Sequence, residues 1–197
     1  ESDSAALREN CGLRADLPLL AIAPGSRPSE MRKHLPTMLE ALPEIEKKIG
    51  EFQCILPVAE SLDFDEVRRK ASSSSVYVAV VPEQFLESVR ASDAAVIASG
   101  TASLQTGLAL KPFVIVYRVS PLTYMIASLL AETKYIGMVN VLADKEIVPE
   151  LLQNEFTVSS ITDHAVRLLQ DHDYRGTMIS ELNKIGLKLG KPGAYRR

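Results

Sequence analysis

The sequence lacks several features that would assign the protein to a specialised class. No apolar run reaches the length of about 18 residues that a membrane-spanning helix needs. The first residues are polar and of mixed charge, unlike those of a signal peptide. The net charge of −3 provides no dominant basic face for nucleic acid. We therefore expect a globular protein, soluble or peripheral to a membrane, that does not bind nucleic acid.

Cysteine is scarce, and the common nucleotide-binding motifs are missing. The two cysteines, Cys11 and Cys54, lie far apart in unlike settings. We interpret both as reduced thiols of a cytoplasmic protein, without a disulfide or metal role. The dinucleotide motif G-x-G-x-x-G and the phosphate loop G-x-x-x-x-G-K-[ST] are both absent. Their absence weighs against NAD and ATP as ligands.

Two D-x-D patterns, which some sugar-nucleotide enzymes use to hold a divalent metal, occur at Asp63 to Asp65 and at Asp171 to Asp173. We interpret the first as acids in the opening turn of a helix and the second as a solvated connection between helices. His34, His164 and His172 show no metal-ligand spacing. The sequence therefore predicts no metal site.

Short apolar runs alternate with stretches of helical periodicity, which is the pattern of βαβ units around a parallel sheet. Each run is continuously apolar, as expected for strands that helices cover on both faces. We predict an α/β fold over residues 1–197, a single Rossmann-like domain with a doubly wound parallel sheet and extra C-terminal helices. The predicted strands are Leu19 to Ala23, Phe52 to Leu56, Val76 to Val81, Ala94 to Ala98 and Phe113 to Tyr117.

Helical patterns lie between and after these strands. The stretch from Pro36 to Ile49 carries Pro43, so we expect a kink or a break there. The other predicted helices are Ser61 to Ala71, Glu83 to Ala91, Thr101 to Leu110, Pro121 to Glu132, Ile147 to Gln153, Thr162 to Leu169 and Arg175 to Leu189.

The first candidate binding motif, Ala23 to Glu30, follows the first predicted strand directly, where a doubly wound sheet meets its ligands. Gly25 permits close backbone approach, Ser26 offers a hydroxyl and an amide, and Arg27 supplies a forked cation that suits phosphate oxygens. An ordinary strand-to-helix turn, with Pro28 as the first helical residue, accounts for these residues equally well.

The second motif, Ala98 to Gln105, is another strand-to-helix junction. Its small residues expose the amides of a helix N-terminus, where a phosphate is favoured. Gln105, one turn into the helix, is within reach of a ribose or a base edge. The alternative is a helix capped at Ser99 or Thr101 that packs closely on the sheet. Two such junctions in one sheet favour the binding interpretation.

Two later segments carry residues that call for explanation. The strongly apolar stretch from Pro121 to Leu130 suits a helix in the core, with contact to acyl chains or a bilayer as the alternative. Hydrophobic periodicity accounts for the leucines between 139 and 153, but not for Asn140, Glu150 and Gln153.

Four motifs occur in the order found in lipid-A-disaccharide synthases, and the sequence resembles this family over nearly its whole length. The resemblance implies a GT-B glycosyltransferase, in which two Rossmann-like domains face each other across a cleft and the C-terminal one holds UDP. The chain resembles that C-terminal donor domain, so we expect the acceptor domain to precede Glu1 and the isolated chain to be inactive. The motifs are Pro24-Gly25-Ser26-Arg27, Ser99-Gly100-Thr101-Ala102, Pro121-Leu122-Thr123-Tyr124 and Val148-Pro149-Glu150-Leu151-Leu152-Gln153.

The resemblance also implies roles for residues of the first two motifs. Arg27, beside Gly25 and Ser26, would contact the donor phosphate or sugar and stabilise the leaving group. The residues Ser99 to Thr101 would cradle the diphosphate, with Gly100 between them. Gln105 stands where the family commonly has glutamate. A neutral carboxamide accepts ribose hydroxyl hydrogen bonds through one oxygen, where a carboxylate would use two.

The resemblance also implies roles for residues in the C-terminal part of the chain. Asn140 matches the asparagine of a family L-P-N block, although Val139 stands where the family commonly has proline. Glu150 and Gln153 would lie on a helix that faces the cleft near the uridine. All three side chains would contact the donor nucleotide.

The implied reaction is an inverting transfer of diacylglucosamine from UDP-diacylglucosamine to diacylglucosamine 1-phosphate, with no metal or other cofactor. The full-length protein would work at the cytoplasmic face of the inner membrane, as a peripheral protein, and a homodimer is left open. Two alternatives share the fold. One is another GT-B transferase or a sugar-nucleotide epimerase, and the other is a non-catalytic module that binds a nucleotide or a partner.

Overall fold

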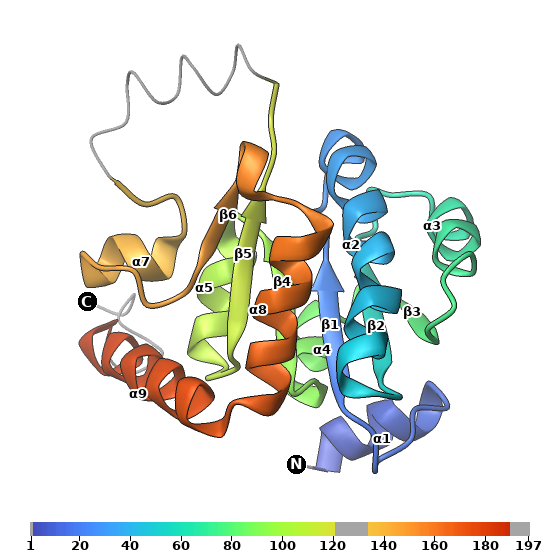
Figure 1. Cartoon of the computed structure of the whole chain (residues 1–197), viewed down its shortest axis with the longest axis horizontal. Coiled ribbons are helices and arrows are strands. Elements are labelled where there is room, and N and C mark those ends of the chain that lie inside the picture. Colours follow the sequence, from blue (N-terminus) through green and yellow to red (C-terminus); the bar gives the residue numbers. More distant parts are fainter. Residues whose placement is uncertain (1, 121–133, 190–197) are drawn as a thin grey trace, which may run out of the picture.

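A computed structural model describes residues 2–120 and 134–189, and an open parallel sheet forms its centre (Figure 1). The strands are β1 (Leu19–Ala23), β2 (Gln53–Val58), β3 (Val78–Pro82), β4 (Ala94–Ala98), β5 (Phe113–Tyr117) and β6 (Glu150–Leu152). Their order is β3-β2-β1-β4-β5-β6, and each neighbouring pair is parallel. The chain therefore winds outwards in both directions from the junction of β1 and β4.

Helices cover both faces of this sheet. Figure 1 shows α2 (Pro28–Ile49) and α8 (Val158–Gln170) in front of it and α4 (Phe85–Ala91) and α5 (Thr101–Leu108) behind it. All residues of β1, β2 and β4 are buried, because neither face of the central strands meets water. The predicted doubly wound α/β fold is confirmed, and so are the predicted bounds of β1, β4 and β5.

The helix α2 runs unbroken through Pro36 and Pro43, so the expected break does not occur. Each proline removes one backbone hydrogen bond. Tertiary packing offsets this loss, because one face of the helix is buried against the sheet and α8. Helical stability in proteins comes mainly from such packing. The buried face consists of Met31, His34, Leu35, Met38, Ala41, Leu42 and Ile45.

Several elements differ from the sequence predictions. The helix predicted from Ile147 to Gln153 is wrong, because β6 and the 3-10 turn η1 (Gln153–Glu155) occupy this segment. The strand β6 pairs with β5, so its backbone hydrogen bonds come from a distant segment. The helices α1 (Ser2–Asn10) and α7 (Met138–Ala143) were not predicted. The helix predicted from Pro121 to Glu132 lies outside the described residues.

The remaining helices are α3 (Phe64–Ala71) beside β3 and α9 (His172–Leu189), which packs against α5 and α8. The predicted C-terminal helices are thus present as α8 and α9. Both cysteines are free, as predicted. Within residues 2–120 and 134–189, no helix combines the length and apolar character required to span a bilayer.

A glycine in α5 allows close packing between α5, α7 and α9. A Cβ atom at Gly107 would lie 2.7 Å from Val139 Cγ1 and 3.3 Å from Leu182 Cδ2, and both side chains are buried. We expect Gly107→Ala to lower the free energy of unfolding by about 1–3 kcal/mol, because the stiff valine cannot turn away. Urea denaturation measures this change.

Gly176, inside α9, provides the matched control. An added Cβ there meets no atom within 4 Å. Gly176→Ala should therefore raise the free energy of unfolding by up to about 1 kcal/mol through helix propensity alone. Two alanine variants that change stability in the same direction would contradict the packing assigned to Gly107.

Candidate functional site

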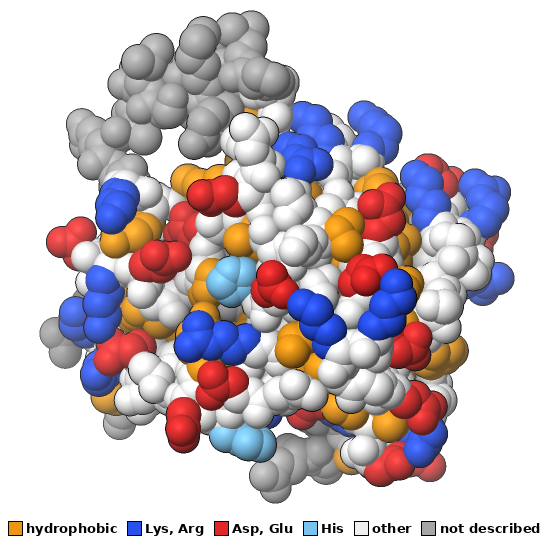
Figure 2. Space-filling model, in the orientation of Figure 1, with side chains coloured by type: hydrophobic (Ala, Val, Ile, Leu, Met, Phe, Trp, Pro, Cys, Tyr) orange, Lys and Arg blue, Asp and Glu red, His pale blue; other side chains and the backbone are white. Residues whose placement is uncertain are grey.

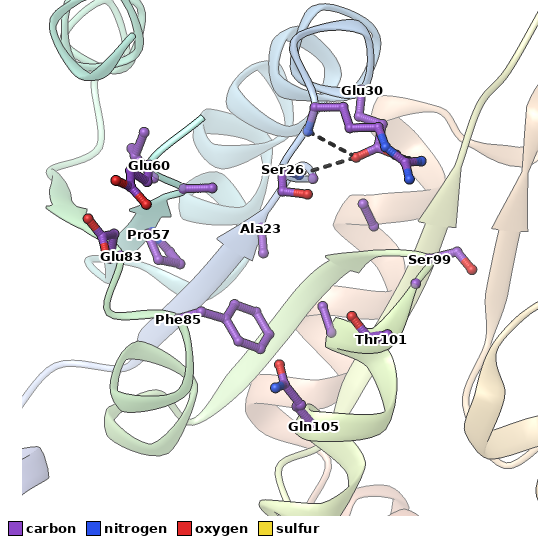
Figure 3. A pocket seen from close by; sticks show the side chains of 17 residues that line it. Ala23, Ser26, Glu30, Pro57, Glu60, Glu83, Phe85, Ser99, Thr101 and Gln105 are labelled. Atoms are coloured by element: carbon purple, nitrogen blue, oxygen red, sulfur yellow. Dashed lines mark hydrogen bonds and ion pairs between the residues drawn. The ribbon is translucent and has the colours of Figure 1, made fainter. Parts of the chain in front are cut away.

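A pocket of about 600 Å³ opens at the carboxyl edge of the sheet, beyond the ends of the neighbouring strands β1 and β4 (Figure 3). Its walls come from the segments that follow β1, β2, β3 and β4. Gly25 to Arg27 and Ser99 to Thr101 all line it, together with Gln105. The structure thus brings together the residues of the first two predicted motifs, although they are more than 70 positions apart in the sequence.

The N-terminus of α5 faces this pocket with unpaired amides. Gly100 precedes the helix with a φ of 152°, and no side chain caps the first turn. Among the described residues, the amides of Gly100, Thr101 and Ala102 have no hydrogen-bond partner. Three free N–H groups and the positive end of the helix dipole favour an anion such as a phosphate.

Ser99 contributes less than expected to this cradle. Its amide donates to the Val116 carbonyl at 2.9 Å, and its hydroxyl donates to the Ile136 carbonyl at 3.3 Å. The prediction of free amides from Ser99 to Thr101 is therefore corrected by one position. The available amides run from Gly100 to Ala102.

The turn between β1 and α2 already binds a carboxylate of the protein itself. The Glu30 carboxylate accepts the amides of Ser26 at 3.2 Å and Arg27 at 3.3 Å (Figure 3). Gly25 has a φ of 118°, and a Cβ atom there would lie 2.4 Å from Glu30 Oε2. Glycine is thus needed at position 25 both for its backbone conformation and for space. The amides of Ser26 and Arg27, directly before α2, are closed to a ligand while Glu30 occupies them.

Arg27 is the cation among the described residues that line the pocket. Its Nη1 lies 3.3 Å from Glu30 Oε1, and the exposed fraction of its side chain is 76%. Such an exposed pair holds the guanidinium only weakly, so Arg27 remains available to a ligand. On the face shown in Figure 2, other Lys and Arg side chains gather at this edge, over the start of α2 and around α3.

Phe85 and Gln105 form the deeper wall of the pocket. Figure 3 shows the Phe85 ring, from the first residue of α4, and the Gln105 carboxamide, from α5, both directed into the pocket. No described residue hydrogen-bonds the Gln105 side chain. Glu60 and Glu83 lie at the outer rim. Phe85 and both glutamates were not predicted, because the ends of β2 and β3 carry no small-residue motif.

Asn140 and Glu150 lie in a separate network that holds the segment before β6. The buried Asn140 amide nitrogen donates to the Val148 carbonyl at 2.7 Å and to Glu150 Oε1 at 2.8 Å. Asn140 Oδ1 accepts the amides of Ile147 at 2.8 Å and Val148 at 3.0 Å. Its hydrogen-bonding capacity is thus used within the protein.

Glu150 is part of β6, so its predicted place on a cleft-facing helix is wrong. Its carboxylate accepts the amides of Ile136 and Gly137, both at 2.9 Å. Glu150 and Asn140 therefore hold residues 136–150 together, outside the pocket between β1 and β4.

Gln153 is also not on the predicted helix. It begins η1 with a φ of 48°, and its Oε1 accepts the Val119 amide at 3.2 Å. Its Nε2 is buried and has no partner among the residues that the structure describes. Gln153 therefore lies beside the end of β5 and not among the residues that line the pocket.

Both D-x-D patterns have the structural roles that the sequence analysis gave them. Asp63 caps α3 by accepting the Glu66 amide at 2.9 Å. Asp171 accepts the Tyr174 amide at 2.9 Å between α8 and α9. Its carboxylate also pairs with Arg167. Within the described ranges, no three His, Cys, Asp or Glu side chains converge as a metal-binding group.

Comparison with known proteins agrees with the motifs. The profile of the family described as lipid-A-disaccharide synthetase matches residues 1–190. The lipid-A-disaccharide synthase of Myxococcus xanthus (strain DK1622) is 39% identical over 192 residues, which are 98% of this chain and 50% of that protein. The chain thus spans about half the length of the curated relatives it matches.

Solved structures with low sequence identity share the fold. The glycosyltransferase WaaG, described as involved in lipopolysaccharide biosynthesis, matches with a TM-score of 0.63 at 14% identity, over 93% of this chain and 46% of that one. A putative UDP-N-acetylglucosamine 2-epimerase from Listeria monocytogenes matches with a TM-score of 0.60 at 14% identity, over 90% of this chain and 44% of that one. The predicted Rossmann-like fold of the GT-B type is confirmed.

The resemblance predicted from four short motifs is confirmed by a family profile that extends over nearly the whole chain, and by relatives that align along its length. The chain belongs to the lipid-A-disaccharide synthetase family.

Proposed function

We propose that this chain is the donor-binding domain of a lipid-A-disaccharide synthase, which transfers diacylglucosamine from UDP-diacylglucosamine to diacylglucosamine 1-phosphate and releases UDP. The observation that carries the proposal is the row of free amides from Gly100 to Ala102. They lie at the junction of β1 and β4, where ligands of doubly wound sheets bind. The diphosphate of the donor is an anion that suits them.

The pocket has room for the nucleoside next to this phosphate cradle. Gln105 lies one turn further along α5, and in this proposal its carboxamide would hydrogen-bond a ribose hydroxyl. The Phe85 ring on the facing helix offers an apolar surface to the base. Asn140, Glu150 and Gln153, which the family resemblance assigned to the nucleotide, would reach it only after a rearrangement of their present hydrogen bonds.

The domain would accelerate the reaction by stabilising the leaving group. The primary hydroxyl of the acceptor loses its proton to a base of the other domain and attacks the anomeric carbon. The bond from that carbon to the β-phosphate oxygen breaks, and its electron pair stays on the phosphate. Arg27 and the amides of Gly100 to Ala102 would stabilise the charge that develops there. No step of this mechanism needs a metal ion.

The other domain, the inner membrane surface and a homodimer belong to the full-length protein in this proposal. A second candidate, another GT-B transferase or a sugar-nucleotide epimerase, shares the pocket and would differ in the sugar that it prefers. The neutral Gln105 favours a third, a non-catalytic module that would bind another nucleotide or a partner but no uridine nucleotide. Uridine-nucleotide binding by this chain separates the first two from the third.

The amide cradle can be tested by proline at the first position of α5. Proline is tolerated there, because the amide of that residue has no partner within the helix. Thr101→Pro removes one N–H from the cradle, so we expect the affinity for UDP to fall about tenfold or more, as for a lost hydrogen bond to a charged group. Calorimetric titration gives the dissociation constants.

Thr101→Ala is the matched control, since it removes the hydroxyl and keeps the amide. We expect its affinity for UDP to stay within about threefold of the original. The cradle would be ruled out if the proline variant bound UDP as tightly as the alanine variant did.

Arg27 is tested in the full-length enzyme. Arg27→Ala should lower turnover by about 100-fold, because it removes a cation from the developing charge on the leaving group. Arg27→Lys keeps the charge without the forked geometry and should give an intermediate rate. Steady-state assays of both variants decide this, and near-normal turnover of the alanine variant would remove Arg27 from the mechanism.

A further inference from the structure

A buried histidine joins two of the loops at the carboxyl edge of the sheet. His34 in α2 has an exposed fraction of 0%. Its Nδ1 lies 2.7 Å from the Pro24 carbonyl oxygen, and its Nε2 lies 3.0 Å from the Arg118 amide nitrogen. Nε2 also lies 3.3 Å from the Arg118 carbonyl oxygen. The Pro24 carbonyl can only accept and the Arg118 amide can only donate, so these two shorter contacts are satisfied by a neutral ring with the proton on Nδ1.

The contacts of His34 with Pro24 and Arg118, which we call the His34 bridge, link segments that are not joined by strand pairing. Pro24 follows β1 and Arg118 follows β5, while β4 lies between these two strands. Pro24 directly precedes the turn from Gly25 to Arg27, which lines the pocket. The position of this turn relative to the β5 side of the sheet therefore depends on the His34 ring.

Arg118, at one end of the His34 bridge, is held by further contacts. The Arg118 guanidinium donates to the carbonyls of Gln153 and Phe156, and it lies 4.8 Å from the centre of the Phe156 ring. The Phe156 ring also packs edge-on against His34, with 5.6 Å between the ring centres. His34 thus fastens the turn after β1 to a cluster that already joins the ends of β5 and β6.

The surroundings of the ring disfavour its protonation. Burial is the largest cause that lowers the pKa of His34 below its usual value, and the Arg118 charge acts in the same direction. Glu30 on α2 opposes both, and so do the hydrogen bonds to backbone carbonyls. Tyr117 at the end of β5 also faces the ring, with 5.9 Å between the ring centres, and Phe156 adds no charge.

We propose that His34 is a positioning residue of the donor site: the neutral ring holds the Pro24 carbonyl and the turn from Gly25 to Arg27 in place, and protonation of the ring weakens binding of the donor. A protonated ring would present N–H groups on both sides. Nε2–H would then oppose the Arg118 amide at 3.0 Å, and it could donate only to the Arg118 carbonyl at 3.3 Å. The ring would have to shift, and the Arg118 amide would lose its acceptor. This inference rests on the proposed donor site.

The test is the affinity of the chain for UDP-N-acetylglucosamine as a function of pH, from pH 5.5 to 8. Both phosphates of this probe are esterified, so it lacks the second phosphate ionisation near about pH 6. We expect the affinity of the wild-type chain to fall as the pH drops through the pKa of His34, by up to about tenfold per pH unit below that pKa.

Two variants separate positioning from a merely structural role. His34→Asn keeps an N–H close to the place of Nδ1, but it cannot titrate and does not reach the Arg118 amide as Nε2 does. Its affinity should therefore be below that of the wild type at pH 8 and stay level down to pH 5.5. His164→Asn is the matched control, because burial also lowers the pKa of His164 but that residue does not line the pocket. It should keep the wild-type pH profile.

The outcomes distinguish this inference from the proposed function. Nucleotide binding that is level in the wild type from pH 5.5 to 8, or that falls equally in the His34→Asn variant, would overturn the role of His34 and leave the donor site intact. A wild-type chain that binds no nucleotide at any pH refutes the donor site, and the role of His34 with it. A nitrogen-15 NMR spectrum of the imidazole, without nucleotide, shows independently whether the neutral Nδ1–H form exists.

Discussion

Two helices begin on either side of the point where the strand order reverses, and the first amides of a helix have no partner within it. This constraint governs the site. The amides of Ser26 and Arg27, directly before α2, receive the Glu30 carboxylate, whereas those from Gly100 to Ala102 at the start of α5 remain open. An anionic ligand therefore has one free cradle, at Gly100 to Ala102, with Arg27 across the pocket from it. In the proposed donor site, this difference between the starts of the two helices places the diphosphate at α5.

The charges around the pocket support the same conclusion. Glu30, Glu60 and Glu83 line it together with a single described cation, Arg27, so net charge does not attract an anion there. Binding would depend instead on directed N–H groups, which stabilise an anion without the desolvation of a further cation. Such a site is selective for the position and shape of a phosphate, which agrees with a protein whose net charge is −3.

The sequence analysis succeeded where local pattern and tertiary structure agree. Runs such as Ala94 to Ala98 are buried on both faces, so continuous apolar character was enough to predict them. The three residues of β6 carry no such signal. They are held in place by distant contacts, namely pairing with β5 and the hydrogen bonds of the buried Asn140. The pocket residues of the first two motifs were predictable, since each follows a strand. The occupation of the Ser26 and Arg27 amides by Glu30 was not predictable, because it depends on side-chain geometry.

The most direct test of the account is a calorimetric titration of this chain with UDP, alongside ADP, with and without magnesium. The account predicts saturable binding of UDP, weaker binding of ADP and no dependence on magnesium. Equal affinity for the two nucleotides, or UDP binding only with magnesium, would contradict a metal-independent uridine-nucleotide site at the start of α5.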